Sequence, residues 1–356
     1  MNGTLLITGG AGFIGSNLAI SFKKNDPDLK IIVLDNLKRR GSELNLQRLK
    51  SVGIEFVHGD IRNKEDMQFD DREISLIVEC SAEPSILAGF NHSPEYLVNS
   101  NLFGAINCLE IARKQKADFI FLSTSRVYPV EKMNALNFVE ESTRFALLPD
   151  QPFAGASQNG IAEDFPLEGV RSLYGATKLA AELIAQEYAD MYGFRTIINR
   201  CGVVAGPWQM GKIDQGVFTL WIAAHHFNKN LHYIGFGGTG KQVRDVLHID
   251  DLFDLIQLQI QDLQKYNGKI YNVGGGLLNS LSLVETTQLC QEISGQEITI
   301  GNTVENRPAD IKSYITDNEK IIQDSGWKPK RNAEQTLCDI WNWIRDNESQ
   351  LKGILN

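Results

Sequence analysis

The 356-residue sequence lacks a membrane-spanning apolar run, a cysteine framework and an excess of basic residues. A spanning helix needs about 20 consecutive apolar residues, so no membrane partner is expected. The five cysteines are scattered, odd in number and never in a C-x-x-C pair, and the six histidines form no H-x-x-x-H pair. Neither a disulfide framework nor a metal site is therefore expected. A formal net charge of −9 argues against nucleic acid as the main partner. The chain runs directly from MNGT into an apolar segment, which leaves no room for a signal peptide and predicts a cytoplasmic location.

The sequence does contain a regular alternation of short apolar runs and helical stretches over its first 200 residues. The runs are TLLITGG, IIVLDN, IEFVHGD, ISLIVECSA, DFIFLSTS and RTIINRCG. Continuous rather than alternating hydrophobicity is typical of strands that are covered on both faces. Strands of this kind alternating with helices predict an α/β fold with a doubly wound parallel sheet of the Rossmann type.

Beyond residue 205 the sequence changes to glycine-rich and aromatic segments, which predict a second, smaller α+β domain for the substrate. The amphipathic stretch 248–268 is expected to return to the first domain. We therefore expect a first domain over residues 1–200 and 240–268, and a second domain over 201–239 and 269–356. Residues 129–172 look like a loop with a few small elements, and a loop of that length inside a compact domain is usually functional.

A glycine pattern follows the first predicted strand. In ITGGAGFIGSNLA, Gly9, Gly12 and Gly15 stand between this strand and a predicted helix. Glycines let backbone amides approach a pyrophosphate at the positive N-terminus of a helix. Asp35 closes the second strand 20 residues after Gly15, where its carboxylate can accept both ribose hydroxyls and repel a 2′-phosphate. NAD is therefore the expected cofactor; a tight turn with an incidental aspartate is the structural alternative.

Two neighbouring features bear on the same cofactor. Arg39 and Arg40 weaken the preference for NAD over NADP without reversing it. Asp60, after FVHG, is placed to reach the adenine amine, and a solvated loop aspartate is the alternative.

A Tyr-x-x-x-Lys pattern occurs twice. Tyr174 and Lys178 lie in the predicted helix 172–193, where residues four apart share one face. An ammonium there, together with an oxidised nicotinamide, would lower the tyrosine pKa and make Tyr174 a general base near neutral pH. Two helix-surface residues are the alternative. Tyr128 and Lys132 form the second match, but a proline directly after the tyrosine gives a poor helix context, and we interpret this match as chance.

Taken together, these motifs resemble the extended short-chain dehydrogenase/reductases that act on nucleotide sugars. The resemblance runs nearly end to end and includes TGGAGFIGSNL, VHGDIRN, VNSNLFGAINCLE, STSRVY, YGATK, GKQVRDVLHIDD, YNVGGG and RPAD. It implies a Rossmann domain with a nucleotide-sugar domain, NAD as cofactor, no metal, a nucleotide-diphosphate sugar as substrate, and a homodimer or homotetramer.

The resemblance also implies a catalytic set, a cofactor set and a substrate set. Thr124 is expected to hydrogen-bond the reacting sugar hydroxyl, Tyr174 to act as the base and Lys178 to hold the nicotinamide ribose. The expected cofactor-binding residues are Gly9, Gly12, Phe13, Ile14, Gly15, Asp35, Asn36, Asp60, Ile61, Ala82, Asn101, Tyr174 and Lys178. The expected substrate-binding residues are Thr124, Ser125, Arg126, Gln209, Arg244 and Arg307.

Departures from the family's sugar dehydratases narrow the expected reaction. Those enzymes carry Asp and Glu after the hydroxyl residue, whereas this chain has Ser125 and Arg126, which cannot do that acid–base work. Arg126 is expected to line the sugar pocket, with a surface arginine or a salt bridge as the alternative. Arg244 and Arg307 match the arginines that clamp the nucleotide diphosphate, for which planar bidentate donors are suited; surface ion pairs are the alternative.

The stretches DNLKRRGSELNLQRLKSVGIEFVHGDIRN, DQG and NSLSLVE are similar to members of the family that invert C2 of a CDP-linked deoxysugar, as in CDP-paratose, for lipopolysaccharide O-antigen biosynthesis. Glu79 departs from the family, since many members carry a histidine there. A 4-epimerase and an NAD(P)-dependent reductase or decarboxylase stay open as alternatives. A non-catalytic dinucleotide-binding sensor would leave the set of Thr124, Tyr174 and Lys178 unexplained.

Overall fold

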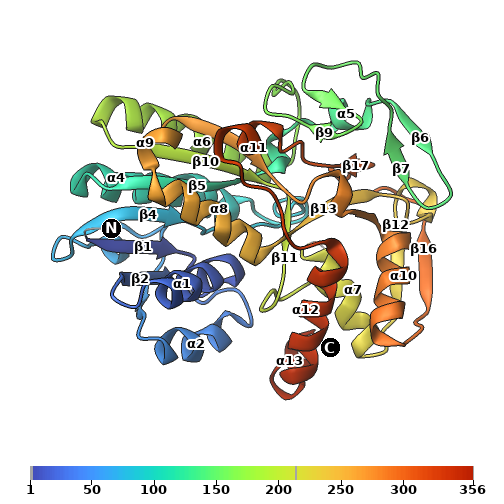
Figure 1. The fold of residues 1–356 in the computed structure, drawn as a ribbon, viewed down its shortest axis with the longest axis horizontal. Coiled ribbons are helices and arrows are strands. Elements are labelled where there is room, and N and C mark those ends of the chain that lie inside the picture. The colour runs from blue at the N-terminus through green and yellow to red at the C-terminus, as the bar shows by residue number, and fades with distance from the viewer. Residues whose placement is uncertain (1–2, 213–214, 356) are drawn as a thin grey trace. The chain divides into compact units, whose positions relative to one another are not determined.

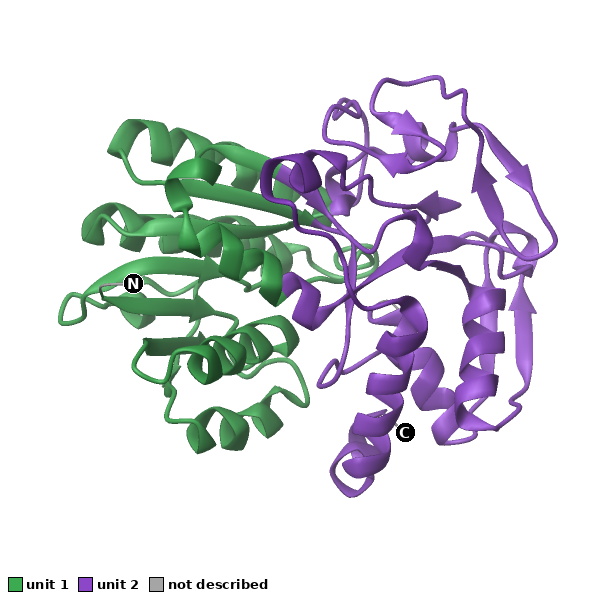
Figure 2. Cartoon of the chain, in the orientation of Figure 1, with its two compact units in different colours: residues 1–124, 173–200, 253–270 green, residues 125–172, 201–252, 271–356 purple. Residues whose placement is uncertain are grey.

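The computed structural model describes residues 3–212 and 215–355 (Figure 1). The chain divides into two compact units, each built from three segments of the sequence (Figure 2). Unit 1 comprises residues 1–124, 173–200 and 253–270, and unit 2 comprises residues 125–172, 201–252 and 271–356.

Unit 1 is built on a seven-stranded sheet with the strand order β14-β10-β5-β4-β1-β2-β3. The strands are β1 (Thr4–Thr8), β2 (Lys30–Asp35), β3 (Glu55–His58), β4 (Ile74–Glu79), β5 (Asp118–Thr124), β10 (Thr196–Cys201, in unit 1 up to Arg200) and β14 (Lys269–Val273, in unit 1 up to Ile270). The pairs β1–β2, β2–β3, β1–β4 and β4–β5 are all parallel. The chain runs outward from β1 to β3 and then returns to β4 on the other side of β1. This order is that of a doubly wound sheet with its switch point between β1 and β4, and it confirms the predicted fold class.

The helices of unit 1 pack on this sheet through apolar faces. Helices α4 and α6 pack against each other and against β5, while α1 packs on β1 and β2 and meets α8 through Phe22 and Phe253, whose ring centroids are 4.9 Å apart. The helices are α1 (Phe13–Asn25), α2 (Asn45–Ser51), α3 (Glu95–Val98), α4 (Gly104–Gln115), α6 (Leu173–Tyr192), α8 (Ile249–Gln261, in unit 1 from Phe253 on) and α9 (Leu263–Tyr266). The helix predicted over 172–193 is therefore α6. Its buried face includes Thr177, Lys178, Ala181, Glu182 and Ala185, so it carries charge into the interior.

Unit 2 has short strands and packed helices, as the sequence predicts for an α+β domain. The prediction that this domain is the smaller one is wrong, because residues 125–172 and 240–252 also belong to it. Strand β13 (Val243–His248) pairs with β11 (Val203–Ala205), β15 (Ser280–Ser282) and β17 (Ser313–Tyr314), and β12 (Leu231–Ile234) pairs with β16 (Ile300–Thr303). Helices α7 (Val217–His226), α10 (Leu283–Ser294) and α12 (Ala333–Asp346) pack together. Helix α10 begins with a capping box in which Ser282 and Glu285 satisfy each other's backbone N–H groups. The remaining helices are α5 (Val130–Asn134), α11 (Glu319–Ser325) and α13 (Glu348–Leu355).

The division into units differs from the predicted domains at residues 125–172 and 240–252, which both belong to unit 2, and at residues 269–270, which belong to unit 1. The segment 125–172 forms α5 and two small hairpins, β6 (Phe138–Glu140) with β7 (Phe145–Leu147) and β8 (Ala156–Ser157) with β9 (Gly160–Ile161). Backbone hydrogen bonds tie these hairpins to distant parts of unit 2, from the Phe145 N–H to the Lys241 carbonyl and from the Ile161 N–H to the Ile315 carbonyl. Residues 240–252 belong there because they contain β13.

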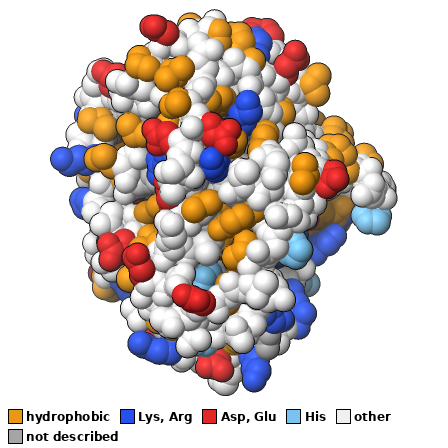
Figure 3. All heavy atoms as spheres, turned by 90° about the vertical axis from the view of Figure 1, so that its right-hand side faces the viewer, with side chains coloured by type: hydrophobic (Ala, Val, Ile, Leu, Met, Phe, Trp, Pro, Cys, Tyr) orange, Lys and Arg blue, Asp and Glu red, His pale blue; other side chains and the backbone are white. Residues whose placement is uncertain are grey.

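Among the described residues, no helix is both long and apolar enough to cross a bilayer. On the face drawn in Figure 3, acidic and basic side chains alternate with apolar ones instead of forming a basic surface.

Candidate active site

The glycine-rich turn between β1 and α1 has the geometry that a pyrophosphate needs. Gly9 has a φ of +62°, which favours glycine, and a Cβ on Gly15 would lie 2.4 Å from the Gly9 carbonyl oxygen. Gly12 is the N-cap of α1, and no side chain caps this helix end. The first backbone N–H groups of the helix are thus available for an anion. Phe13 and Ile14, the first two residues of α1, are half-buried.

Asp35 stands at the end of β2, next to this turn. Its carboxylate accepts hydrogen bonds from the Ala11 N–H at 3.1 Å and from the Leu37 N–H at 2.8 Å. Burial raises the pKa of Asp35, and these backbone N–H groups oppose the rise. The side chain is therefore fixed beside the turn, as a ribose-binding carboxylate requires.

Asp60 makes several hydrogen bonds to neighbouring residues and is not a solvated loop aspartate. Its oxygens accept hydrogen bonds from the Arg62 backbone and guanidinium, at 2.7 Å for Nη2, and from the Asn36 side chain at 2.9 Å. Burial alone would raise the pKa of Asp60, but these hydrogen bonds outweigh it and lower the pKa to about 2. An adenine amine would have to share this carboxylate with Arg62 and Asn36, and Asn36 is positioned by the same hydrogen bonds.

We expect the change Asp60→Asn to lower the free energy of unfolding at pH 7 by about 1–2 kcal/mol, allowing for solvent screening at the partly exposed Arg62. The folded pKa of Asp60 lies below its ordinary value of 3.8, so its stabilisation is fully present above pH 3.8 and is lost as the pH falls toward 2. Urea unfolding at pH 7, 4 and 3 measures the difference between wild type and variant, which should shrink at the lower values. A difference in the free energy of unfolding that stayed the same at all three pH values would show that the stabilisation does not come from the charge of Asp60.

The predicted catalytic pair lies one turn apart on α6. Tyr174 is in the first turn of the helix and half-buried, whereas Lys178 is 2% exposed. The Lys178 ammonium lies 3.9 Å from the centre of the Phe121 ring on β5 and 3.4 Å from Glu79 Oε2 at the end of β4. Thr124 is the last residue of β5 and is buried. All three predicted catalytic residues thus belong to unit 1, on two elements that pack together.

A second buried charge pair holds the same helix. Glu182, one turn beyond Lys178, accepts hydrogen bonds from Arg200 on β10, at 2.8 Å for Nη2, and from the Ser123 hydroxyl on β5. The Glu182 and Arg200 side chains are 1% and 4% exposed. These contacts fix the position of α6 on the strand that ends in Thr124. The sequence indicated no role for Glu182 and marked Glu79 only as a departure from the family. Each is a glutamate within an otherwise apolar stretch, which is the signal that could have indicated a buried charge.

Asn101 anchors the segment after β4. It lies in a π-helical turn, Asn99–Phe103, and exchanges hydrogen bonds with the Glu83 backbone at 2.8 and 3.1 Å. Its amide also reaches Thr177 Oγ1 at 3.4 Å, directly before Lys178. Ala82 in the anchored segment is exposed. Asn101 therefore joins the segment that contains Glu83 to helix α6, which carries Tyr174 and Lys178.

The second Tyr-x-x-x-Lys match is part of the interior of unit 2. Tyr128 is 2% exposed, and its hydroxyl lies 2.8 Å from Asn272 Oδ1. Lys132 lies in the five-residue helix α5 and pairs with Glu168 at 3.3 Å. Tyr128 and Lys132 therefore have separate structural partners.

Three arginines of unit 2 gather around one carboxylate. Asp310, which is buried, accepts from Arg244 Nη2 at 3.1 Å and from Arg307 Nη2 at 3.3 Å. Arg126 donates to the carbonyl of Ala309, a residue with a φ of +57°. Burial first, and then the positive charges of Arg126 and Arg307, lower the pKa of Arg244 to about 10. The three guanidinium groups outnumber the two carboxylates, Asp310 and Asp245, that act on Arg244. The resulting excess of positive charge favours an anion.

The other predicted substrate residues have different surroundings. Ser125 begins a short 3-10 turn with Arg126 and is half-buried. Gln209 is buried, donating to the Val204 carbonyl at 2.8 Å and accepting from Thr219 Oγ1 at 2.8 Å. Gln209 thus has internal partners on both ends of its amide.

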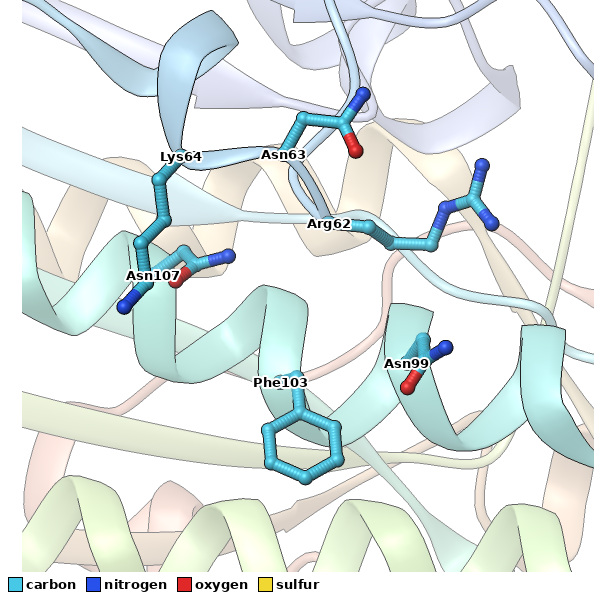
Figure 4. Close-up of a pocket in the computed structure, with 6 residues that line it drawn as sticks. All are labelled: Arg62, Asn63, Lys64, Asn99, Phe103 and Asn107. Carbon is cyan, nitrogen blue, oxygen red and sulfur yellow. The ribbon is translucent and has the colours of Figure 1, made fainter.

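A cavity of about 370 Å³ lies in unit 1 on the side of α4 (Figure 4). Its lining residues are Arg62, Asn63, Lys64, Asn99, Phe103 and Asn107. None of them belongs to the predicted catalytic or cofactor sets, although Asn107 holds Ile61 through a 2.7 Å hydrogen bond to its carbonyl.

Comparisons with known proteins agree with this geometry. The model of the NAD dependent epimerase/dehydratase family matches residues 5–274. CDP-paratose 2-epimerase of Salmonella typhi is 33% identical over 351 residues, which cover 95% of this chain and 98% of that protein. The dTDP-glucose 4,6-dehydratases of Bacillus anthracis, in complex with NAD, and of Streptomyces venezuelae, with NAD bound, superpose with TM-scores of 0.76 and 0.78. Each of these two is 26% identical and covers 99% of both chains.

The chain therefore belongs to the NAD-dependent epimerase/dehydratase family. This membership confirms the predicted family, an enzymatic role and NAD as the cofactor. The glycine-rich turn, the uncapped start of α1 and Asp35 fit that cofactor.

Proposed function

We propose that the protein is an NAD-dependent nucleotide-sugar epimerase that inverts C2 of a CDP-linked deoxysugar, in the manner of CDP-paratose to CDP-tyvelose. The observation that carries this proposal is the similarity to CDP-paratose 2-epimerase of Salmonella typhi over almost the whole length of both chains. The arginines around Asp310 support a diphosphate group on the substrate. A homodimer or homotetramer, a cytoplasmic location and a part in O-antigen biosynthesis stay predictions.

In this proposal the glycine-rich turn, the start of α1 and Asp35 would hold NAD, which would supply reversible hydride transfer at the sugar carbon. Tyr174, as tyrosinate, accepts the proton of the hydroxyl on that carbon and gives it back when the hydride returns. The ammonium of Lys178 favours the tyrosinate, and Thr124 hydrogen-bonds the same sugar hydroxyl. Ser125 and Arg126 supply no acid–base pair for eliminating water, which favours epimerisation over dehydration. A 4-epimerase is the second candidate, because the same residues would serve at C4.

The reaction in deuterated water tests the proposal. We expect CDP-paratose to be converted to its C2 epimer with the inverted carbon fully protiated, because the hydride stays within the enzyme. Product NMR measures the deuterium at each carbon. Slight exchange beside the transient ketone is compatible with this mechanism, since that position is acidified.

Stoichiometric deuterium at the inverted carbon would refute hydride return. UDP-glucose under the same conditions is the control for the second candidate, since turnover of UDP-glucose but not of CDP-paratose would favour a 4-epimerase. A reductase would instead need a stoichiometric supply of reduced cofactor.

A further inference from the structure

We propose that Glu79 is a positioning residue that holds the Lys178 ammonium and moderates its effect on Tyr174. This inference rests on the proposed role of Tyr174 as the base. No role was assigned to Glu79 from the sequence, where it was noted only as a departure from the family.

The geometry places Glu79 and Lys178 in one enclosed site. Glu79 is the last residue of β4, and its Oε2 lies 3.4 Å from Lys178 Nζ. The two side chains are 1% and 2% exposed. The centre of the Phe121 ring lies 3.9 Å from the same ammonium, within the range of a cation–π interaction. A carboxylate and an aromatic face therefore fix the ammonium in one place.

Stability alone is a poor reason for such a pair. Removing two charges from water opposes folding by an amount that can exceed their mutual attraction, so a buried ion pair is weak evidence of stabilisation. An ammonium, however, has three donors in a flexible arrangement. A partner at the end of β4 selects one position for a long side chain that lies one helical turn from Tyr174.

The charge of Glu79 has a definite electrostatic consequence. The ionisable groups that face it are Lys178 on α6 and the Cys108 thiol on α4, whose pKa burial raises well above the ordinary value. Burial raises the pKa of Glu79 too, and the Lys178 ammonium opposes that rise. A carboxylate beside Lys178 partly cancels the field that lowers the pKa of Tyr174. Removing this negative charge should therefore lower the pKa of Tyr174 further.

The test compares Glu79→Gln with Glu182→Gln, a matched change in the other buried pair of the same helix. Two quantities are measured against pH, namely kcat/KM and the absorbance of tyrosinate. The chain has nine tyrosines, so the absorbance of Tyr174 is obtained by subtracting the titration of the same protein with the added change Tyr174→Phe. We expect both midpoints to fall by about one pH unit in Glu79→Gln, the scale of a nearby charge. Glu182→Gln should lose stability but keep the wild-type midpoints.

Unchanged midpoints in Glu79→Gln would overturn the proposal and leave Glu79 as a structural residue. Should that variant fail to fold, Glu79→Asp decides, because it keeps the charge on a shorter side chain. In Glu79→Asp, a fall of the midpoints by less than the one pH unit expected for Glu79→Gln would support the proposal. Midpoints and turnover equal to those of the wild type would overturn it. The absorbance titration needs no turnover. If the wild type left every CDP-sugar unchanged, the proposed reaction would fail while the link between Glu79 and Tyr174 could still be measured.

Discussion

We expect Tyr174→Phe to reduce turnover by roughly 10²–10⁴-fold, the usual contribution of a positioned general base. The change removes the hydroxyl that exchanges a proton with the sugar but keeps the ring in the first turn of α6. The tertiary contacts of Lys178 with Glu79 and Phe121 do not involve Tyr174, so the fold and NAD binding should be preserved. Steady-state kinetics, circular dichroism and NAD titration measure the three quantities.

Tyr128→Phe is the matched control, because Tyr128 carries the other Tyr-x-x-x-Lys match. Its hydroxyl lies against Asn272 in the interior of unit 2, so the change should lower the free energy of unfolding by about 1 kcal/mol and leave turnover near that of the wild type. Near-wild-type activity in Tyr174→Phe would remove Tyr174 from the mechanism. A large loss of kcat in a folded Tyr128→Phe would show that the two matches were assigned the wrong way round.

The parts of the fold that the sequence predicted depend on local patterns. The parallel strands are continuous apolar runs in the sequence. The glycine-rich turn can be recognised from the spacing of Gly9, Gly12 and Gly15. Helix α6 was predicted within one residue at each end, since its apolar period and the glycine after it are local signals. Tyr174 and Lys178 share a face because four residues make about one turn of a helix. None of these inferences needed a distant partner.

The parts that the sequence did not predict depend on distant partners. Glu79 and Lys178 are 99 residues apart, and neither residue alone indicates that the other neutralises it. Residues 125–172 join unit 2 through backbone hydrogen bonds to segments far along the chain, such as that from Phe145 to Lys241. Backbone bonds of this kind leave no mark on side-chain composition. Asp310 follows Arg307 by three residues, but only the fold brings Arg126 and Arg244 to the same place.

The arginines around Asp310 lead to the second large expected effect. We expect Arg244→Ala to raise KM for the CDP-sugar roughly ten- to hundredfold, because a hydrogen bond to a charged group contributes about 1.5–3 kcal/mol. NAD affinity should stay close to that of the wild type, since the hydrogen bonds of Arg244 go to Val243, Asp310 and Ile311 and not to the glycine-rich turn or Asp35. Initial rates over a range of CDP-sugar concentrations and an NAD titration measure the two effects.

Arg144→Ala is the control for loss of an arginine ion pair in the same unit. Arg144 pairs with Glu285 at the start of α10, so its removal should weaken folding without changing KM. Arg244→Lys separates charge from geometry, because lysine keeps the positive charge but cannot donate in the planar, bidentate way of a guanidinium. A partial rescue of KM is expected in that variant. An unchanged KM in Arg244→Ala would show that the diphosphate binds elsewhere, and an equal rise in Arg144→Ala would mean that KM reports the integrity of unit 2 rather than a contact with the substrate.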